Sequence, residues 1–359
     1  MADRYTLQRR DFLKRMGCAV GAAALTGKSV LTPLAAAAAA PPRPDDPYGQ
    51  IHFPVSQLGR AAPSARVSLV KGDNRYAIVR RSLELIKDEI LGSIGNKKVL
   101  IKPNIVLADC AACVTHVDAI RAVLDVITPV VKSPILIAES SVQNTMQGFR
   151  YNNYMRLEKE YNTRIVDLNT DGFQHRYVLG LDNKPSRIRI INTLLDPDLY
   201  VISVARMKTH NYVYVTLSIK NVIMASPLND YKVNDKGLMH QASPARHDLL
   251  HYNMFHIGQE VFPDLAVIDG FVGVEGNGPA WGSLIASRVA LASLDAVAAD
   301  VTATRVMGFD PRIVNYLNAM AEAGMGQGDS DRIEILGSPL EKCIMPYKPN
   351  ERMAELYKL

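Results

Sequence analysis

The sequence predicts an α/β fold with a mainly parallel, doubly wound, Rossmann-like sheet, helices on both faces and a small β insert. Two observations support this fold class. Short apolar runs rich in β-branched residues alternate with segments of helical period, at the spacing of βαβ units. Charged and amide side chains follow directly after several of these runs, where open parallel sheets bind their ligands.

The first half of the chain supplies four predicted strands and three helices. Strands are expected at 66–70, 98–101, 134–138 and 164–168, and helices at about 76–91, 117–127 and 151–161. Lys102-Pro103-Asn104 ends the second strand, because proline disfavours helix in the residue before it. Thr115 and Asp118 have the spacing of a capping box for the helix that follows.

The second half continues the alternation after a predicted hairpin insert at 172–192. Strands are expected at 199–204, 264–268, 287–291 and 332–336, and helices after Ser243-Pro244, at 295–307 and after Asp310-Pro311. Each Xaa-Pro pair offers an N-cap with proline at the first helical position. The polar stretch 229–237 reads as a loop.

The first 40 residues have the three parts of an export signal. Arg9-Arg10-Asp11-Phe12-Leu13-Lys14 is a twin-arginine motif, followed by an apolar segment at 16–25 and a small-residue tract at 35–40. We expect a signal peptide at 1–40, a proline-rich leader at 41–65, the α/β domain at 66–340 and a C-terminal tail at 341–359. The twin-arginine translocase and signal peptidase would be partners during export of the folded protein to the periplasm or another extracytoplasmic space. No later run reaches the ~18 apolar residues that a stable membrane span needs.

The export signal also carries most of the charge. Six basic and two acidic residues at 1–40 give +4 of the formal total of +5, so the remainder is close to neutral. The charge therefore gives no support for a nucleic-acid partner. Because passengers of the twin-arginine route often acquire a metal or organic cofactor before crossing, we expect a divalent metal or a metal-containing cofactor.

Three cysteines follow the signal: Cys110, Cys113 and Cys343. The first two form a C-x-x-C pair, which could be a disulfide, a redox pair or half a metal site. A second C-x-x-C is lacking, so a four-cysteine zinc or iron–sulfur site within one chain is excluded. A structural disulfide or plain thiols are preferred over redox catalysis, since no thioredoxin-like sequence surrounds the pair.

The densest chemistry lies in Met207–Asn211 and Thr216–Asn221. Lys208 and His210 would share one face of a continuing strand, and Thr216 and Lys220 are co-facial on either a strand or a helix. Two ammonium groups and one imidazole suit an anionic ligand such as a carboxylate or phosphate. The alternative is that the lysines are solvated and the histidine is structural.

A histidine-bearing helix is expected after Ser243-Pro244. His247 and His251 would lie one turn apart on one face, a spacing that can bind one metal, with His210 or His240 as a third ligand. Alternatively these histidines form structural hydrogen bonds or face solvent.

A glycine-rich segment, 269–279, follows the strand at 264–268. It matches neither a dinucleotide fingerprint nor a phosphate-binding P-loop. Asp269 and Glu275 are candidates for metal ligands or a general base. The alternative is a tight turn with Glu275 in solvent.

Five segments together resemble the proteins of domain of unknown function 362. They are VLIKPN at 99–104, ILIAESS at 135–141, MKTH at 207–210, TLSIKN at 216–221 and LAVIDGFVGVEGNGP at 265–279. The resemblance implies an α/β fold and a mostly unassigned role; some members add ferredoxin-type cysteine clusters, which this chain lacks. By position it implies as recurrent polar residues Lys102, Asn104, Glu139, Ser140, Lys208, His210, Lys220, Asn221, Asp269, Glu275 and Asn277.

These observations favour an exported, metal- or cofactor-dependent enzyme acting on a small anionic substrate, by redox or proton-transfer chemistry. The anion would be held by Lys102, Asn104, Glu139, Ser140, Lys220, Asn221 and Asn277. Catalysis would fall to Lys208, His210, Asp269 and Glu275, and a metal to His210, His247 and His251. The alternative is a non-catalytic protein that carries a metal, an iron–sulfur precursor or an anion to an enzyme.

Overall fold

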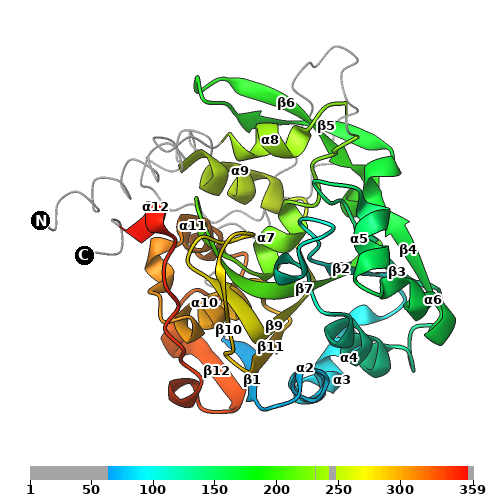
Figure 1. The fold of residues 1–359 in the computed structure, drawn as a ribbon, viewed down its shortest axis with the longest axis vertical. Helices are drawn as coiled ribbons and strands as arrows, with labels where there is room; N and C mark the ends of the chain where they lie inside the picture. Colours follow the sequence, from blue (N-terminus) through cyan, green and yellow to red (C-terminus); the bar gives the residue numbers. More distant parts are fainter. Residues whose placement is uncertain (1–63, 231, 242–247, 355–359) are drawn as a thin grey trace, which may run out of the picture. The chain divides into compact units, whose positions relative to one another are not determined.

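A large mixed sheet forms the frame of the protein (Figure 1). The computed structural model describes residues 64–230, 232–241 and 248–354. Its strands run in the order β12-β1-β11-β9-β7-β2-β3-β4, with β10 added beside β9 and β8 beside β7. Their bounds are β1 Ala65–Lys71, β2 Lys98–Pro103, β3 Ile135–Glu139, β4 Thr163–Asp167, β7 Leu199–His210, β8 Tyr214–Thr216, β9 Leu265–Glu275, β10 Ser283–Ile285, β11 Val289–Ser293 and β12 Ile333–Gly337.

Among the eight strands of this path, β11 alone runs antiparallel to its neighbours, and every other adjacent pair is parallel. The predicted fold class, a mainly parallel α/β sheet, is therefore confirmed. The small β insert is the hairpin of β5 (Phe173–Leu179) and β6 (Pro185–Ile191), which contacts α9 and α8 (Figure 1).

Helices connect the strands. Their bounds are α2 Arg75–Glu84, α3 Lys87–Ile94, α4 Val117–Ile127, α5 Thr145–Tyr151, α6 Leu157–Glu160, α7 Ser218–Ile223, α8 Asp235–His240, α9 Asp248–Gly258, α10 Ala296–Val306, α11 Asn315–Glu322 and α12 Glu351–Ala354. Among the described residues, every helix is too short or too polar to span a membrane.

The order of the strands shows where a ligand site is expected at the edge of the sheet. From β2 the chain moves outward through β3 to β4, whereas from β7 it moves the opposite way to β9 and β11. Because β2 and β7 are neighbours, the winding reverses between them. In doubly wound sheets, ligands bind beyond the carboxyl ends of the two strands at this switch point.

Successive side chains of a strand point to opposite faces of the sheet, so their positions show which helices they face. Val99 and Ile101 of β2, with Leu265 and Val267 of β9, belong to the buried cluster that includes α2, α3 and α4. Side chains of opposite parity lie on the other face, where α7 and α10 pack. The side chain of Lys102 therefore belongs to the α7 face.

Five predicted features differ in the structure. The helix expected at 151–161 is instead a 3-10 turn, Tyr154–Arg156, followed by the short α6. The helix expected at 76–91 is two helices, α2 and α3, and the break turns Ile86 into the core with 2% exposure. Part of the loop at 229–237 is the start of α8. The strand at 199–204 continues to His210, because β8 and β9 keep pairing with it. The glycine-rich segment up to Glu275 is strand as well, since β10 and β11 pair with it.

Some predictions fall outside the described residues. The signal peptide at 1–40, the leader predicted at 41–65 apart from its last two residues, and the helix start at Ser243-Pro244 are among them.

Candidate functional site

A small pocket lies beyond the carboxyl ends of β2 and β7. Its volume is about 130 Å³, enough for a small ligand rather than a whole nucleotide. The residues that line it are Lys102, Asn104, Ile105, Val106, Glu139, Ser140, Ser141, Val142, His210, Thr216, Lys220, Asn221, Met224, Ala225, Lys236, His240 and Pro279. The structure thus brings six of the seven residues assigned to the anion, and His210, to one cavity.

Asn221 of α7 forms hydrogen bonds with several residues at the base of this pocket. Its Oδ1 accepts hydrogen bonds from Lys102 Nζ at 3.2 Å and from Asn104 Nδ2 at 2.9 Å. Its Nδ2 donates to the Lys102 carbonyl at 3.0 Å and to Ser203 Oγ at 3.1 Å. One amide therefore joins α7 to the end of β2 and to the middle of β7.

Glu139, the carboxylate of this pocket, is already engaged. Lys102 Nζ lies 2.7 Å from its Oε1, and the backbone N–H groups of Ser140 and Ile105 donate to it at 2.7 and 2.6 Å. Burial lowers the pKa of Lys102, and the charge of Glu139 opposes this shift. The ion pair therefore neutralises Lys102, whereas Lys220 has no carboxylate partner among the described residues.

Lys208 lies behind the pocket, fully buried. Its Nζ donates to Asn104 Oδ1 and to the Cys113 carbonyl, the latter at 3.3 Å. Burial lowers its pKa well below the ordinary value, and the nearby positive charges of Lys220 and Arg206 add to the shift. Lys208 orients Asn104 rather than facing the cavity.

Lys220 and Thr216 face the cavity without partners. Lys220 is 7% exposed, and its Nζ makes no hydrogen bond or ion pair within the described part of the chain. Burial lowers its pKa to about 8. The hydroxyl of Thr216, 3% exposed, is likewise without a hydrogen bond among those residues. Buried polar groups are normally satisfied, so these two side chains are where a ligand would gain most from hydrogen bonding or pairing.

Lys236 is a pocket residue that the sequence analysis missed, because it lies in the stretch interpreted as a loop. Its Nζ donates to Ser140 Oγ and the Met224 carbonyl, both at 2.9 Å. Burial lowers its pKa to about 7, while Glu139 opposes the shift. The only sequence signal for this helix is Asn234, whose side chain accepts a hydrogen bond from the Gly237 N–H and caps the start of α8.

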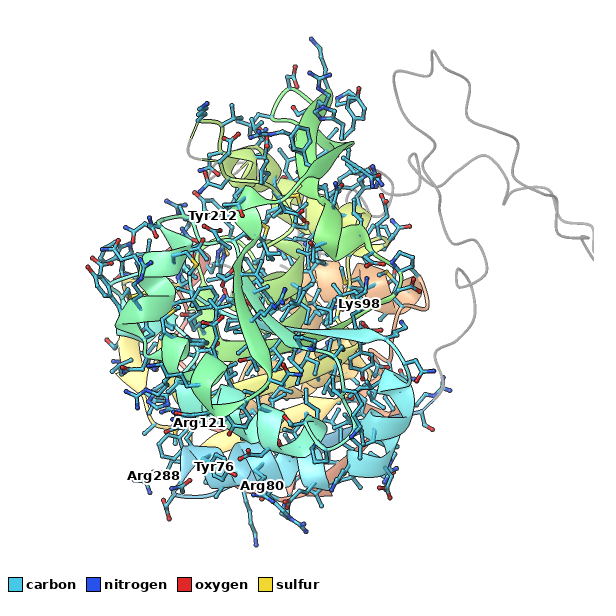
Figure 2. The ribbon with its side chains drawn as sticks, turned by 90° about the vertical axis from the view of Figure 1, so that its right-hand side faces the viewer. Tyr76, Arg80, Lys98, Arg121, Tyr212 and Arg288 are labelled. Carbon is cyan, nitrogen blue, oxygen red and sulfur yellow. A yellow bond between two sulfur atoms is a disulfide. The ribbon has the colours of Figure 1, made fainter. Side chains whose placement is uncertain are left out.

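Two imidazoles close the pocket. His210 Nδ1 accepts the backbone N–H of Tyr212 at 3.1 Å, so the neutral ring carries its proton on Nε2. Its ring centroid lies 5.6 Å from that of His240. Burial, reinforced by the charge of Lys220, lowers both pKa values, that of His240 to about 3. Both rings are therefore neutral near pH 7. Tyr212, beside them, is labelled in Figure 2, where it stands well away from Tyr76 and Arg80.

Asp269 lies on the opposite face of the sheet. It has the parity of Leu265 and Val267, and its carboxylate pairs with Arg75 of α2 at 3.1 Å and accepts the Phe271 N–H at 3.1 Å. It does not line the pocket. The predicted role of Asp269 as a catalytic base or metal ligand at this pocket therefore has no geometric support.

Glu275 and Asn277 contact the C-terminal segment instead. Glu275 Oε2 accepts the Lys348 N–H at 2.8 Å, and Asn277 Oδ1 accepts from Asn350 Nδ2 at 3.3 Å. Neither side chain reaches the pocket.

Of the proposed metal ligands, His247 lies outside the described residues. His251 is buried beside Tyr316, whose backbone N–H donates to its Nδ1 at 3.2 Å, and it does not line the pocket. Within residues 64–230, 232–241 and 248–354, no three His, Cys, Asp or Glu side chains lie close enough to hold a metal ion.

Cys110 and Cys113 form a disulfide, and Cys343 is a buried free thiol. Of the alternatives for the C-x-x-C pair, the structure therefore has the disulfide. The capping box predicted nearby is wrong. Buried Thr115 instead donates to the Val204 carbonyl and accepts the Asn104 N–H, while His116 caps α4.

The profile of a family described as Domain of unknown function (DUF362) matches residues 99–305, more than half of the chain. A thylakoid-associated protein of Synechocystis sp. is 24% identical over 268 residues, which cover 72% of this chain and 80% of that protein. A crystal structure of a protein from Thermotoga maritima aligns with a TM-score of 0.35 at 8% identity, over 71% of this chain and 60% of that one. The chain thus spans less than two thirds of that solved protein.

Proposed function

The chain belongs to the family of domain of unknown function 362, and from its pocket we propose an enzyme that binds a small carboxylate or phosphate and moves a proton on it. The observation that carries this proposal is the pair formed by Lys220 and Thr216. Both residues line one small cavity, and the ammonium group of Lys220 and the hydroxyl of Thr216 lack partners among the described residues. An anion supplies both an acceptor and a counter-charge.

The charge balance of the pocket supports an anion over a neutral or cationic ligand. Lys102, Lys220 and Lys236 line it, against Glu139 as its carboxylate. Because burial disfavours the charged form of each lysine, a bound anion gains more from pairing here than at the surface.

Proton transfer is the chemistry that these side chains can perform. Lys220, with a pKa of about 8, exists in both forms near neutral pH. The Nε2–H of His210 can donate a hydrogen bond to a substrate oxygen. In its unprotonated form, the amine of Lys220 can accept a proton from the substrate carbon next to that oxygen-bearing group. Lys102, Asn104 and Asn221 would hold the pocket rigid around the reacting atoms.

A divalent metal or metal-containing cofactor remains a proposal from the sequence. The neutral imidazoles of His210 and His240 are suitable donors, but the third ligand expected from His247 lies outside the described residues. The donor set therefore fits such a group in part, and no step is assigned to it.

A non-catalytic carrier of an anion, a metal or an iron–sulfur precursor is the second candidate. The observation that favours it is the state of Glu139, whose oxygens are held by Lys102 and two N–H groups. The pocket therefore lacks a free carboxylate base among its described lining residues.

We also propose that the protein works outside the cytoplasm, after export of the folded chain by the twin-arginine route. The support is the Arg9-Arg10 motif with its apolar and small-residue segments. The thylakoid-associated relative is compatible with such a location.

Calorimetric titration with phosphate, acetate and pyruvate tests the anion site. We expect at least one anion to bind, and Lys220→Met to weaken its affinity at least about tenfold, since a charge-assisted contact is lost. Lys98→Met is the matched control, because Lys98 is 70% exposed at the far end of β2, and it should bind normally. Wild-type protein that binds none of the three, or Lys220→Met that binds as well as wild type, would contradict the proposal.

Proton exchange separates the enzyme from the carrier. In deuterium oxide, the enzyme should speed loss of the methyl proton signal of pyruvate in NMR spectra, and Lys220→Met should abolish the effect. Stoichiometric binding without exchange would favour the carrier.

A further inference from the structure

A second, wider hollow opens beside the anion pocket. Its volume is about 530 Å³, and it shares Val106, Val142 and Pro279 with the smaller pocket. Its other lining residues are Leu107, Asn211, Asn277, Gly278, Ala280, Trp281, Asn350, Glu351 and Arg352. Because three residues line both, the two hollows adjoin, with these residues at their common boundary.

We propose that this hollow, here called the vestibule, binds the planar aromatic body of an organic anion whose carboxylate or phosphate head occupies the inner pocket. The inference rests on the proposed anion site and adds the class of ligand to it. The inner pocket, at about 130 Å³, holds little more than the head group, so a larger ligand must extend past Pro279.

Trp281 gives the vestibule its aromatic wall. It is the single tryptophan of the sequence, and its side chain is 82% exposed. Large aromatic side chains are seldom left in water, and a flat ligand that stacks on the indole would cover it. Val142, 45% exposed, adds apolar surface at the boundary with the inner pocket.

The vestibule is a built site, because several contacts fix its walls. Gly278 lies against β7, where any Cβ atom would collide with the Thr209 backbone carbonyl. On the other side, Asn277 Oδ1 accepts hydrogen bonds from Asn350 Nδ2 and the Glu351 N–H, both at 3.3 Å. The guanidinium of Arg352 lies 4.9 Å from the centre of the Tyr212 ring. Both walls are therefore in place before a ligand arrives.

Two matched pairs of probes test this inference: phosphate with phenyl phosphate, and acetate with phenylacetate. By calorimetry, we expect the phenyl member of at least one pair to bind about tenfold more tightly than its parent anion, as stacking on an indole predicts. The same phenyl probe should change the fluorescence of the full-length protein, whose emission comes from Trp281 alone among tryptophans.

Variants assign the effect to the vestibule. Trp281→Ala should reduce the advantage of the phenyl probe to about onefold while the parent anion binds as before, and Trp281→Phe should keep most of the advantage. Leu284→Ala is the control, because Leu284 is 60% exposed on β10 and lines neither hollow, and it should behave as wild type.

The outcomes separate the two proposals. If a parent anion binds but its phenyl relative binds no more tightly, the vestibule inference is overturned and the anion site stands. If the advantage survives in Trp281→Ala, the inference is also overturned, because stacking cannot be its cause. If no member of either pair binds, the vestibule inference is overturned, and the anion site fails with it when pyruvate does not bind either.

Discussion

Four lysine side chains are buried around one end of β2 and β7, and their surroundings differ. Lys102 has a carboxylate partner, Lys208 an amide and a carbonyl oxygen, and Lys236 a hydroxyl and two carbonyl oxygens. Lys220 has none of these among the described residues. Buried ionisable groups with lowered pKa values gather at functional sites, and the unpaired one marks where the ligand belongs.

Lys220→Met should stabilise the folded protein near neutral pH. Burial lowers the pKa of Lys220 from 10.5 to about 8, which corresponds to a penalty of about 3 kcal/mol when the side chain is charged. Below pH 8 both states hold the proton, and the full penalty applies. From pH 8 to 10.5 the unfolded chain binds a proton that the folded protein has lost, so the free energy of unfolding rises with pH.

Urea unfolding at pH 7 and pH 10 measures this effect. The variant should exceed wild type by about 1–3 kcal/mol at pH 7, and the difference should shrink at pH 10. Lys98→Met, which changes a 70% exposed side chain, should match wild type at both values. A destabilised Lys220→Met at pH 7 would mean that the ammonium group has a structural partner after all.

At the scale of elements, α7 is the piece that assembles the pocket. This six-residue helix follows β8 and carries both Lys220 and Asn221. Its first turn is held by Asp300 of α10, whose carboxylate accepts the N–H groups of Ser218 and Ile219 at 2.9 and 3.0 Å. Burial raises the pKa of Asp300 to about 7, and the hydrogen bonds from Ser218 and Ile219 oppose this shift, so the contact with α7 offsets part of the cost of burying the carboxylate.

Asp300→Ala should therefore weaken both folding and binding. It leaves two buried N–H donors unsatisfied, which costs about 2–4 kcal/mol in the free energy of unfolding. Because α7 then loses its anchor, the affinity for the bound anion should also fall, as measured by calorimetry below the unfolding temperature.

Asp310→Ala is the matched control. Asp310 also caps a helical turn, Pro311–Ile313, but its side chain is 43% exposed and does not line the pocket. This variant should lose about 1 kcal/mol and keep its anion affinity. Equal losses of affinity in both variants would show that general destabilisation, rather than α7, controls binding.

The sequence predicted most elements but not their full lengths. The strand at 199–204 was identified from its apolar run, yet β7 continues through Arg206 and Lys208, where pairing with β8 and β9 buries even charged side chains. Period and composition cannot reveal such pairing, because it depends on distant segments. The same reason explains Thr115, whose hydroxyl bridges the middle of β7 and the residue after β2 instead of capping a helix.

At the scale of the whole molecule, strand order decides which polar residues meet. Lys102, Glu139 and His210 follow or end different strands, and the sequence predicted that such ends share an edge. It did not predict the face of the sheet on which each side chain lies. Asp269 was therefore placed with these residues, although its position in β9 directs its side chain to the other face, toward Arg75. Lys236 was missed because the short helix that brings it to the pocket lacks a strong periodic pattern.

The packing of the C-terminal segment on the domain is not predictable from the sequence pattern. It was predicted to be a tail, but Tyr347 is 4% exposed and its hydroxyl lies 2.8 Å from Ser287 Oγ. The Lys348 carbonyl accepts the Gly276 N–H at 2.8 Å. Gly273 is a signal of this packing, because a Cβ atom there would collide with the Tyr347 hydroxyl.

Ending the chain after Ser338 should therefore reduce the free energy of unfolding by at least about 4 kcal/mol, since Tyr347 and Met353 lose their burial. Tyr347→Phe, which removes one hydroxyl, should cost about 1 kcal/mol in the same urea titration. If the shortened chain still folds, it should bind the parent anion but lose the preference for the phenyl probe, because Asn350 and Arg352 line only the vestibule. A shortened chain that retains this preference would show that Trp281 acts without the C-terminal wall, and would confine the aromatic site to the segment between β9 and β10.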